Sequence, residues 1–249
     1  MSSYIHHLHQ PVHVTWRDFL TQENTHLVNE IERTLKEEAV AVTPSDSRVL
    51  HFLTQDLSAV KVLIIGQDPY PQAGVATGRA FEVGTLRSWQ EPFRNVSLKN
   101  IIRALYHAEK SEFLTYNLIK AQLGERGLFN TPFKLLPPDQ LFKYWEQQGV
   151  LLLNTSFTCQ IGKPGSHAKL WATFTRELLT YINTINPRIS WFLWGNHARG
   201  ITDHLVLKNS YASNHPMICK AGENDFLFGR VNPFKATAEM IDWTGKSRL

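Results

Sequence analysis

The sequence predicts an α/β protein, a single-domain α/β/α sandwich with a central, mainly parallel four-stranded sheet flanked by helices. Three continuous apolar segments, at 61–65, 149–153 and 189–194, have the composition of strands buried on both faces of a parallel sheet. A fourth, weaker strand candidate covers 210–213. Helix-like stretches separate the segments, as right-handed strand–helix–strand connections require.

Amphipathic patterns place the helices. Apolar residues recur at helical spacing in three sets: Leu98, Ile101, Ile102 and Leu105; Trp171, Phe174, Leu178 and Ile182; and Phe19, Leu27, Ile31 and Leu35. We expect a helix capped by Ser97, a helix over 171–182 and an N-terminal helix between about Trp16 and Glu38. A further helix is expected to start near His197. Residues 125–138, rich in glycine and proline, predict a long surface connection ahead of a helix over 140–147.

The domain organisation predicted for the 249 residues is simple, because no linker or break in composition divides the chain. We expect one domain over residues 16–249, preceded by a flexible N-terminal tail over residues 1–15. The histidines of this tail, at positions 6, 7, 9 and 13, are more typical of a solvated terminus than of a metal site. The formal net charge of +4 is compatible with a polyanionic partner without requiring one.

Cysteine usage and apolar content indicate the environment. Cys159 and Cys219 lack the paired spacing of a zinc or redox motif, which favours a reduced compartment and no structural metal. Residues 1–10 lack the apolar core of a signal peptide, and no apolar run is long enough to span a membrane. These features predict a soluble, intracellular protein without a membrane partner. We expect it in the cytoplasm, with a nuclear or viral setting left open, and take a monomer as the default.

Polar residues stand where the four predicted strands end. Asp68, Asn154, Asn196 and His215 come at or just after successive strand ends. Each alone has an ordinary explanation, because Gly, Asp and Pro after a strand form turns and a lone Asp often caps one. The recurrence at four strand ends favours a functional site, since parallel strands bring their carboxyl ends to one edge of the sheet.

The side chains at this edge suit recognition and cleavage of a flat ligand. Asp68 can activate water, stabilise a nearby cation or cap a turn. Asn154 presents an acceptor and two donors in one plane, which suits the reading of a ligand edge. A neutral His215 can donate a hydrogen bond to a developing oxyanion. Tyr70 and Phe81 offer aromatic faces to a π-bearing ring.

Several motifs in one order carry a family resemblance. They are Gln67-Asp68-Pro69-Tyr70 with Gly78 and Phe81, Ser97-Leu98-Lys99-Asn100, Leu151-Leu152-Leu153-Asn154, Leu193-Trp194-Gly195, His215-Pro216 and Ile241-Asp242-Trp243. Over roughly Trp16 to Trp243 the chain resembles the family 1 uracil-DNA glycosylases. The resemblance implies hydrolysis of the N-glycosidic bond of a flipped-out deoxyuridine in DNA, which releases uracil, leaves an abasic site and initiates base-excision repair. No lyase activity, metal or organic cofactor is expected.

The resemblance also implies roles and partners. Asp68 and His215 are the expected catalytic residues, and Gln67, Tyr70, Phe81 and Asn154 the expected uracil-binding residues. The expected DNA-binding residues are Ser97, Gly195, Asn196, Pro216, Met217 and Ile218. The expected partners are single- and double-stranded DNA containing uracil, free uracil as product, and a proteinaceous inhibitor of such glycosylases.

The chain departs from the family pattern in four places. Pro71 stands where the family usually has His, Phe93-Arg94-Asn95-Val96 largely replaces the usual prolines, and Asn196 stands where Ser is common. After Pro216 the usual Ser-Pro-Leu-Ser segment is absent, so Met217 or Ile218 is either the apolar wedge that enters the duplex or a residue packed under a longer loop. These departures keep one alternative open: a catalytically weakened, glycosylase-like DNA-binding or replication accessory module.

Overall fold

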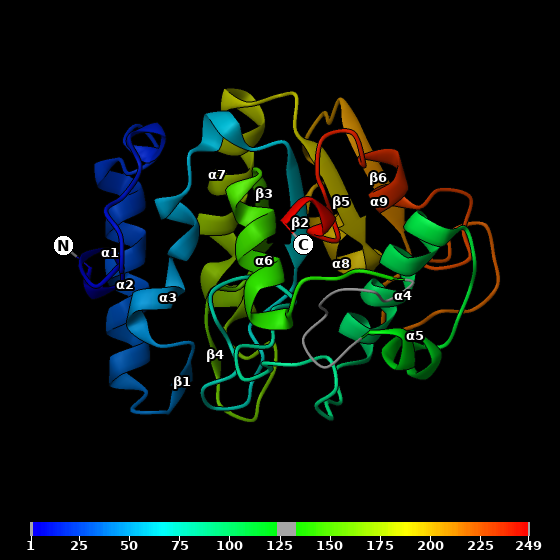
Figure 1. The fold of residues 1–249 in the computed structure, drawn as a ribbon. Helices are drawn as coiled ribbons and strands as arrows, with labels where there is room; N and C mark the ends of the chain where they lie inside the picture. The colour runs from blue at the N-terminus through cyan, green and yellow to red at the C-terminus, as the bar shows by residue number, and fades with distance from the viewer. Residues whose placement is uncertain (1, 124–132, 249) are drawn as a thin grey trace.

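The central sheet is parallel throughout, in the strand order β3-β2-β5-β6 (Figure 1). Its strands are β2 (Val62–Gly66), β3 (Val150–Asn154), β5 (Ser190–Trp194) and β6 (Asn209–Ser213). The computed structural model describes residues 2–123 and 133–248. Val62 of β2 lies opposite both Val150 and Ser190, so three strands start level and their carboxyl ends share one edge. The predicted fold class and the four strands are confirmed.

Helices cover both faces of this sheet. The helices on one side are α4 (Val96–Lys110), α5 (Tyr116–Gln122), α6 (Pro138–Gln147) and α9 (Pro233–Ala236), and the main helices on the other are α2 (Gln22–Glu37) and α7 (Ala168–Ile185). Alternate residues of β2 serve the two layers: Val62 and Ile64 pack with the first set, Leu63 and Ile65 with the second. This double burial explains why β2 carries no polar side chain at any position.

Shorter elements complete the described chain. They are α1 (Ser3–His6), α3 (Asp46–Val49), α8 (Gly195–Ile201), the antiparallel pair β1 (Val42–Thr43) and β4 (Cys159–Gln160), and 3₁₀ turns at Val14–Trp16, His51–Thr54, Leu57–Ala59 and Lys246–Arg248. Helix α8 begins directly at the end of β5, close to the start expected at His197.

Two predicted helix starts are wrong by a few residues. Helix α4 begins at Val96 after an extended Asn95, so Ser97 lies buried in the first turn and is not the cap. Helix α2 begins only at Gln22, where the Thr21 hydroxyl accepts a hydrogen bond from the Asn24 amide at 3.1 Å. Most of the surface connection predicted at 125–138 lies outside the described residues, and α6 follows it from Pro138.

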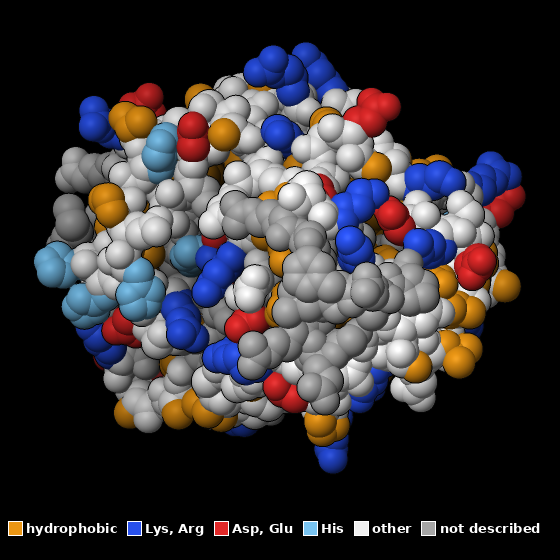
Figure 2. Space-filling model, in the orientation of Figure 1, with side chains coloured by type: hydrophobic (Ala, Val, Ile, Leu, Met, Phe, Trp, Pro, Cys, Tyr) orange, Lys and Arg blue, Asp and Glu red, His pale blue; other side chains and the backbone are white. Residues whose placement is uncertain are grey.

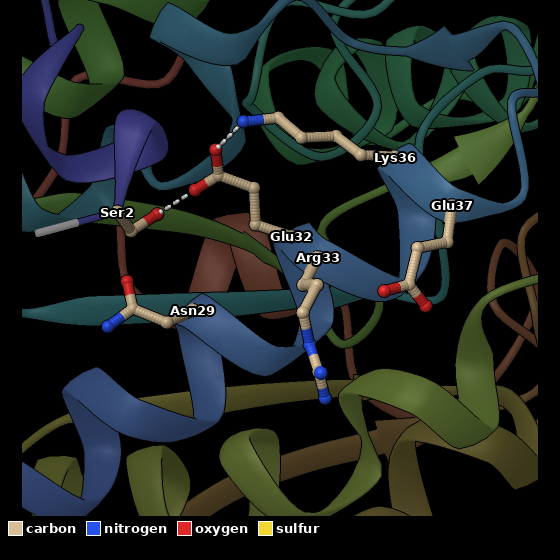
Figure 3. A pocket seen from close by; sticks show the side chains of 6 residues that line it. All are labelled: Ser2, Asn29, Glu32, Arg33, Lys36 and Glu37. Atoms are coloured by element: carbon tan, nitrogen blue, oxygen red, sulfur yellow. Dashed lines mark hydrogen bonds and ion pairs between the residues drawn. The ribbon is translucent and has the colours of Figure 1, made fainter.

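The N-terminal segment, expected as a flexible tail over residues 1–15, is instead packed against the domain over its described residues. Tyr4 is buried, with its ring centroid 6.4 Å from that of Trp171 on α7. Glu32 on α2 accepts a hydrogen bond from the Ser2 hydroxyl at 2.6 Å (Figure 3). It accepts another from the Ser3 amide at 2.8 Å. A buried ring and a shared carboxylate hold the segment, and neither produces a recognisable local pattern in the sequence.

Glu32 is ionised in this arrangement. Burial raises the pKa of its carboxyl, but hydrogen bonds from Lys36, Ser2 and Ser3 outweigh burial and lower the pKa to about 2. The Lys36 ammonium lies 2.6 Å from the carboxylate, one helical turn further along α2 (Figure 3).

The surface drawn in Figure 2 mixes charges of both signs. Lys and Arg side chains alternate with Asp and Glu across this face, and His side chains gather towards the N-terminal elements. Among the described side chains, this face therefore shows no continuous basic patch. No helix in the described part of the chain is long and apolar enough to cross a membrane.

Truncating Tyr4 tests whether the N-terminal segment is part of the domain. We expect Tyr4→Ala to lower the free energy of unfolding by about 3 kcal/mol, because it removes a buried ring from its contact with Trp171. Urea denaturation measures the change, with Val206→Ala, at an 89% exposed position, as the control. A loss below about 0.5 kcal/mol, typical of surface positions, would show that the segment is only loosely attached.

Candidate active site

A cleft of about 440 Å³ opens at the carboxyl edge of the sheet. It is lined by the end of β2 and the following loop, by Phe81, by Ser97 of α4, by Asn154 at the end of β3, and by the loop that follows β6. Of the residues predicted from the sequence, the structure brings Gln67, Asp68, Tyr70, Phe81, Ser97, Asn154, His215, Met217 and Ile218 to this one cleft.

Asn154 is held against the backbone of the neighbouring strand. It pairs with Gly66 at the ends of β3 and β2, and its side chain is buried. A Cβ atom at position 66 would lie 2.4 Å from the Asn154 Oδ1 atom and 2.8 Å from the Ala80 Cβ atom. The carboxamide therefore has room only because residue 66 is glycine, and close packing fixes its orientation.

Asp68 is positioned by a turn from another part of the chain. The Gly165 amide, in the loop after β4, donates a hydrogen bond to Asp68 Oδ2 at 2.6 Å. Burial raises the pKa of Asp68, while this hydrogen bond and the nearby His197 lower it; the net shift is upward. The carboxylate is thus half-buried, anchored through one oxygen, and more basic than an ordinary aspartate.

His215 is held in a defined tautomer. The Met217 amide donates to His215 Nδ1 at 3.1 Å, which places the ring hydrogen of the neutral imidazole on Nε2. Burial lowers the pKa of His215, and the neighbouring His197 lowers it further. The side chain is therefore a neutral hydrogen-bond donor at neutral pH.

The backbone behind His215 is close-packed. A Cβ atom on Gly195, where φ is 90°, would lie 3.0 Å from the His215 Cβ atom. The next residue, Pro216, is buried, and its carbonyl accepts a hydrogen bond from Asn100 Nδ2 on α4 at 2.6 Å. Gly195 and Pro216, predicted as DNA-binding residues, thus lie behind His215 and do not line the cleft.

His197 influences the pKa values of both catalytic candidates, Asp68 and His215. The Thr155 hydroxyl donates to the Gln67 carbonyl at 3.0 Å, so His197 Nε2, 2.6 Å from the same hydroxyl oxygen, acts as the donor there. Burial lowers the pKa of His197, although Asp68 raises it in part. A largely neutral His197 leaves the negative charge of Asp68 only weakly compensated.

Two aromatic residues form the walls of the cleft. Phe81 has a left-handed backbone, with a φ of 65°, and its ring centroid lies 5.4 Å from that of Trp194 and 6.3 Å from that of His215. The Tyr70 hydroxyl donates to the Phe81 carbonyl at 3.4 Å. Burial raises the pKa of Tyr70 to about 12, despite a hydrogen bond with Asn95 that lowers it, so the phenol is neutral.

The remaining predicted DNA-binding residues lie at the rim or outside it. Met217 and Ile218 are 59% and 57% exposed at the mouth of the cleft. Asn196 does not line the cleft; it is exposed on the first turn of α8, where its side chain accepts a hydrogen bond from Arg199. Pro71 lines the cleft, and its carbonyl accepts a hydrogen bond from the Gly162 amide at 2.9 Å.

The arrangement combines a carboxylate, a neutral imidazole, a fixed carboxamide and aromatic walls. Within the described residues, no three His, Cys, Asp or Glu side chains cluster closely enough to hold a metal ion. A family model described as the uracil DNA glycosylase superfamily matches residues 54–223. The chain belongs to the uracil DNA glycosylase superfamily.

Relatives of known name agree with this membership. Uracil-DNA glycosylase 1 of Listeria monocytogenes is 33% identical, over 92% of this chain and 96% of the relative. Uracil-DNA glycosylase of Sodalis glossinidius is 32% identical, over 93% and 96%. Of the solved structures, the UNG from Nitratifractor salsuginis matches with a TM-score of 0.67 at 23% identity, covering 92% of this chain and 91% of that one. Mimivirus uracil-DNA glycosylase matches with a TM-score of 0.66 at 21% identity, covering 98% and 86%, so the fold is shared.

Sequence reasoning missed three residues of this glycosylase-superfamily site. Gly165 holds Asp68, Thr155 joins Gln67 to His197, and Arg79 lines the cleft beside Phe81. The Pro164-Gly165 pair predicts a turn, but nothing local shows which carboxylate the turn reaches. Arg79 lies inside the first motif, between Gly78 and Phe81, so its position in the sequence could have identified it as a residue of the site.

Adding a methyl group at Gly66 tests the fixed carboxamide. We expect Gly66→Ala to lower kcat/KM for uracil excision about 100-fold, because the new Cβ would displace Asn154 from its working position. Gly222→Ala is the control, since a Cβ there meets no atom within 4 Å. Circular dichroism checks that both variants are folded. If a folded Gly66→Ala protein kept wild-type kcat/KM, the orientation of Asn154 would not depend on this contact.

Proposed function

We propose that this protein is a uracil-DNA glycosylase that hydrolyses the N-glycosidic bond of a flipped-out deoxyuridine, releases uracil, leaves an abasic site and so initiates base-excision repair. The observation that carries the proposal is the convergence of Asp68, Asn154, His215 and Phe81 on one cleft in a chain of this superfamily. Relatives of similar length that bear this name support it.

Base selection follows from the geometry of Asn154. Uracil carries an N3 hydrogen and an O4 acceptor, which the carbonyl oxygen and the amide nitrogen of Asn154 match. Cytosine reverses both groups, and each buried group left unpaired costs about 1–3 kcal/mol. Because the Gly66 backbone packs directly against the carboxamide, Asn154 cannot easily adapt to the wrong base.

The other lining residues complete the base pocket. Phe81 stacks on the ring of the base, and Gln67 binds a uracil carbonyl. Tyr70, neutral and fixed through its hydroxyl, lies against ring carbon 5 and excludes the methyl group of thymine. A base must leave the DNA stack to reach these groups, which restricts the substrate to flipped-out nucleotides.

Bond cleavage develops positive charge on the sugar and negative charge on the base. The Asp68 carboxylate stabilises the sugar cation and accepts a proton from the attacking water, whose oxygen bonds to C1′. His215 donates its Nε2 hydrogen bond to uracil O2 and stabilises the departing anion, which then takes a proton from solvent. A raised pKa for Asp68 and a lowered pKa for His215 suit these two tasks.

We also propose that the enzyme is monofunctional. A coupled lyase step proceeds through a Schiff base with an amine, most often that of lysine. Among the described residues that line the cleft, none is lysine. Hydrolysis by water at Asp68 therefore fits the site better than attack by a protein amine.

DNA approaches across the rim of the cleft. Exposed Met217 and Ile218 supply the apolar wedge that fills the space left by the flipped base. Ser97 at the cleft and Asn196 at the exposed start of α8 contact the flanking phosphates. A structure of a mimivirus UNG variant in complex with UGI supports a proteinaceous inhibitor as a partner.

An excision assay tests the function directly. Oligonucleotides with uracil opposite adenine, uracil opposite guanine or uracil in a single strand are incubated with the protein in chelator, and alkali-labile abasic sites are measured. We expect cleavage of all three, and we expect Asp68→Asn to slow it about 100-fold or more without weakening DNA binding.

Asn154→Asp is expected to reduce the preference for uracil over cytosine about 10-fold, because a carboxylate cannot donate to O4. Binding without any cleavage would support the accessory module instead.

The pH dependence of kcat/KM tests the charge states. Asp68 must be ionised and its pKa is raised, so activity falls on acidification along a limb above the range of an ordinary aspartate. His215 must be neutral and its pKa is lowered, so activity stays flat through the range where an ordinary histidine titrates. A loss of activity between pH 7 and about 6.5 that disappears in His215→Gln would contradict a neutral His215.

A further inference from the structure

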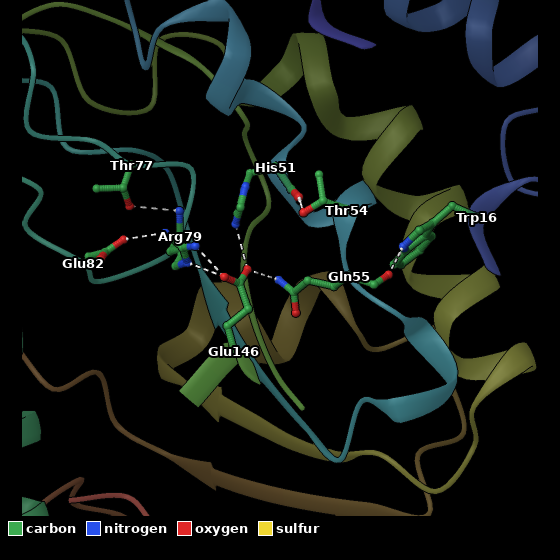
Figure 4. Close-up of polar contacts among 8 residues, drawn as sticks. All are labelled: Trp16, His51, Thr54, Gln55, Thr77, Arg79, Glu82 and Glu146. Carbon is green, nitrogen blue, oxygen red and sulfur yellow. Dashed lines mark hydrogen bonds and ion pairs between the residues drawn. The ribbon is translucent and has the colours of Figure 1, made fainter. Parts of the chain in front are cut away.

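A buried ion network lies directly behind the stacking residue Phe81. Arg79 lines the base cleft, and it also lines a second cleft of about 530 Å³ on the opposite side of the 77–87 segment. Figure 4 shows its guanidinium between two carboxylates, those of Glu82 and Glu146. Arg79 therefore separates the two clefts.

Glu146 on α6 is the centre of this network. Its carboxylate accepts hydrogen bonds from Arg79 Nε at 2.9 Å, from His51 Nε2 at 2.7 Å and from Gln55 Nε2 at 2.5 Å (Figure 4). A second hydrogen bond comes from a terminal nitrogen of Arg79 to the same Oε2 atom, so two guanidinium donors bind one carboxylate oxygen. We call Arg79, Glu82, Glu146, His51 and Gln55 the Arg79 network.

The network is shielded from water. The exposed side-chain fractions are 12% for Arg79, 14% for Glu146 and 5% for Glu82. Burial alone would raise the pKa of Glu146, but His51 and Arg79 lower it overall. Burial likewise opposes the charge of Arg79, whereas Glu146 and Glu82 raise its pKa. Buried charges of this kind are costly to assemble, which favours a specific geometric task.

The network encloses the strained residue of the base pocket. Arg79 comes two residues before Phe81 and Glu82 comes one residue after it, and their side chains are 3.2 Å apart. Phe81, between them, has a φ of 65°, which a bulky residue adopts only where its surroundings impose it. The chain enters this bend through Gly78, where φ is 91° and a Cβ would lie 2.3 Å from the Arg48 carbonyl oxygen.

Backbone contacts fix the same bend from both ends. The Arg79 amide donates to the Thr77 hydroxyl at 3.2 Å, and the Ala80 amide donates to the Leu152 carbonyl on β3 at 3.2 Å. The side-chain network ties the same segment to α6 and to the 51–55 turn through charged groups. The Phe81 ring, in contrast, meets only Trp194 and His215 among the ring contacts of the described residues.

We infer that Arg79 is a positioning residue for catalysis: through Glu146 and Glu82 it holds Phe81 in the left-handed conformation that presents the ring to the base. The inference rests on the proposed uracil-excision function. It assigns a role in the reaction to a residue that touches neither the scissile bond nor the edge of the base. The second cleft is then the outer side of the Arg79 network, which fixes one wall of the base pocket.

A double-mutant cycle tests this role. Arg79→Met keeps the unbranched stem of the side chain and removes the guanidinium fork, and we expect it to lower kcat/KM for uracil excision about 10-fold. In the Phe81→Ala background the same change is expected to lower kcat/KM less than about 2-fold, because the ring that Arg79 positions is gone. Glu146→Gln, which keeps the shape of the acceptor, is expected to follow the same pattern, and Arg79→Lys to restore only part of the loss.

The outcomes separate the alternatives. Equal losses with and without the Phe81 ring would show that the network serves stability alone and would overturn the inference, as would wild-type kcat/KM in Arg79→Met. Arg87→Met, which removes a neighbouring exposed arginine bonded to the Gly84 carbonyl, is the control and should leave kcat/KM unchanged. If Arg79→Met fails to fold, the Glu146→Gln cycle decides. A folded wild-type protein without excision activity would instead reject the proposed function.

Discussion

The contact between Gly66 and the Asn154 carboxamide is the constraint on which the site depends. The two residues face each other at the ends of β2 and β3, and a Cβ atom on residue 66 would lie 2.4 Å from Asn154 Oδ1. The carboxamide can therefore serve as a rigid template only while the two strands stay in register. Burial of the strands on both faces imposes that register. The packing of the apolar core therefore also determines how the base is selected.

The two catalytic candidates at the carboxyl edge of the sheet have pKa values shifted in opposite directions. Asp68 is made more basic than usual by burial, and His215 is made less basic by burial and by His197. A carboxylate that attracts positive charge and an imidazole that donates without becoming charged are what cleavage of a glycosidic bond requires. The Arg79 network holds its buried charges beside Phe81, whose aromatic ring forms one wall of the cleft.

The strands and most residues of the cleft were predictable because their signals are local. A fully apolar run followed by Asp68 or Asn154 indicates both a buried strand and a polar strand end, and parallel topology then brings the ends together. The Gly165 contact with Asp68, the packing of Tyr4 on Trp171 and the clamp between Arg79 and Glu146 were not predictable. Each joins residues distant in the sequence, and tertiary packing rather than periodicity decides which of them meet. Ser97 was wrongly predicted as the helix cap, because Asn and Ser are both favoured at that position. The extended backbone lies at Asn95, which is therefore the cap.

The central claim is that one rigid cleft both reads uracil and cleaves its bond to the sugar. A crystal structure of Asp68→Asn bound to duplex DNA with a single deoxyuridine tests it most directly. The account predicts the uracil in the cleft, its N3 and O4 paired with Asn154, its ring stacked on Phe81 and its O2 within hydrogen-bond distance of His215 Nε2. A uracil that remains stacked in the duplex, or that enters the cleft with Asn154 unpaired, would contradict the account.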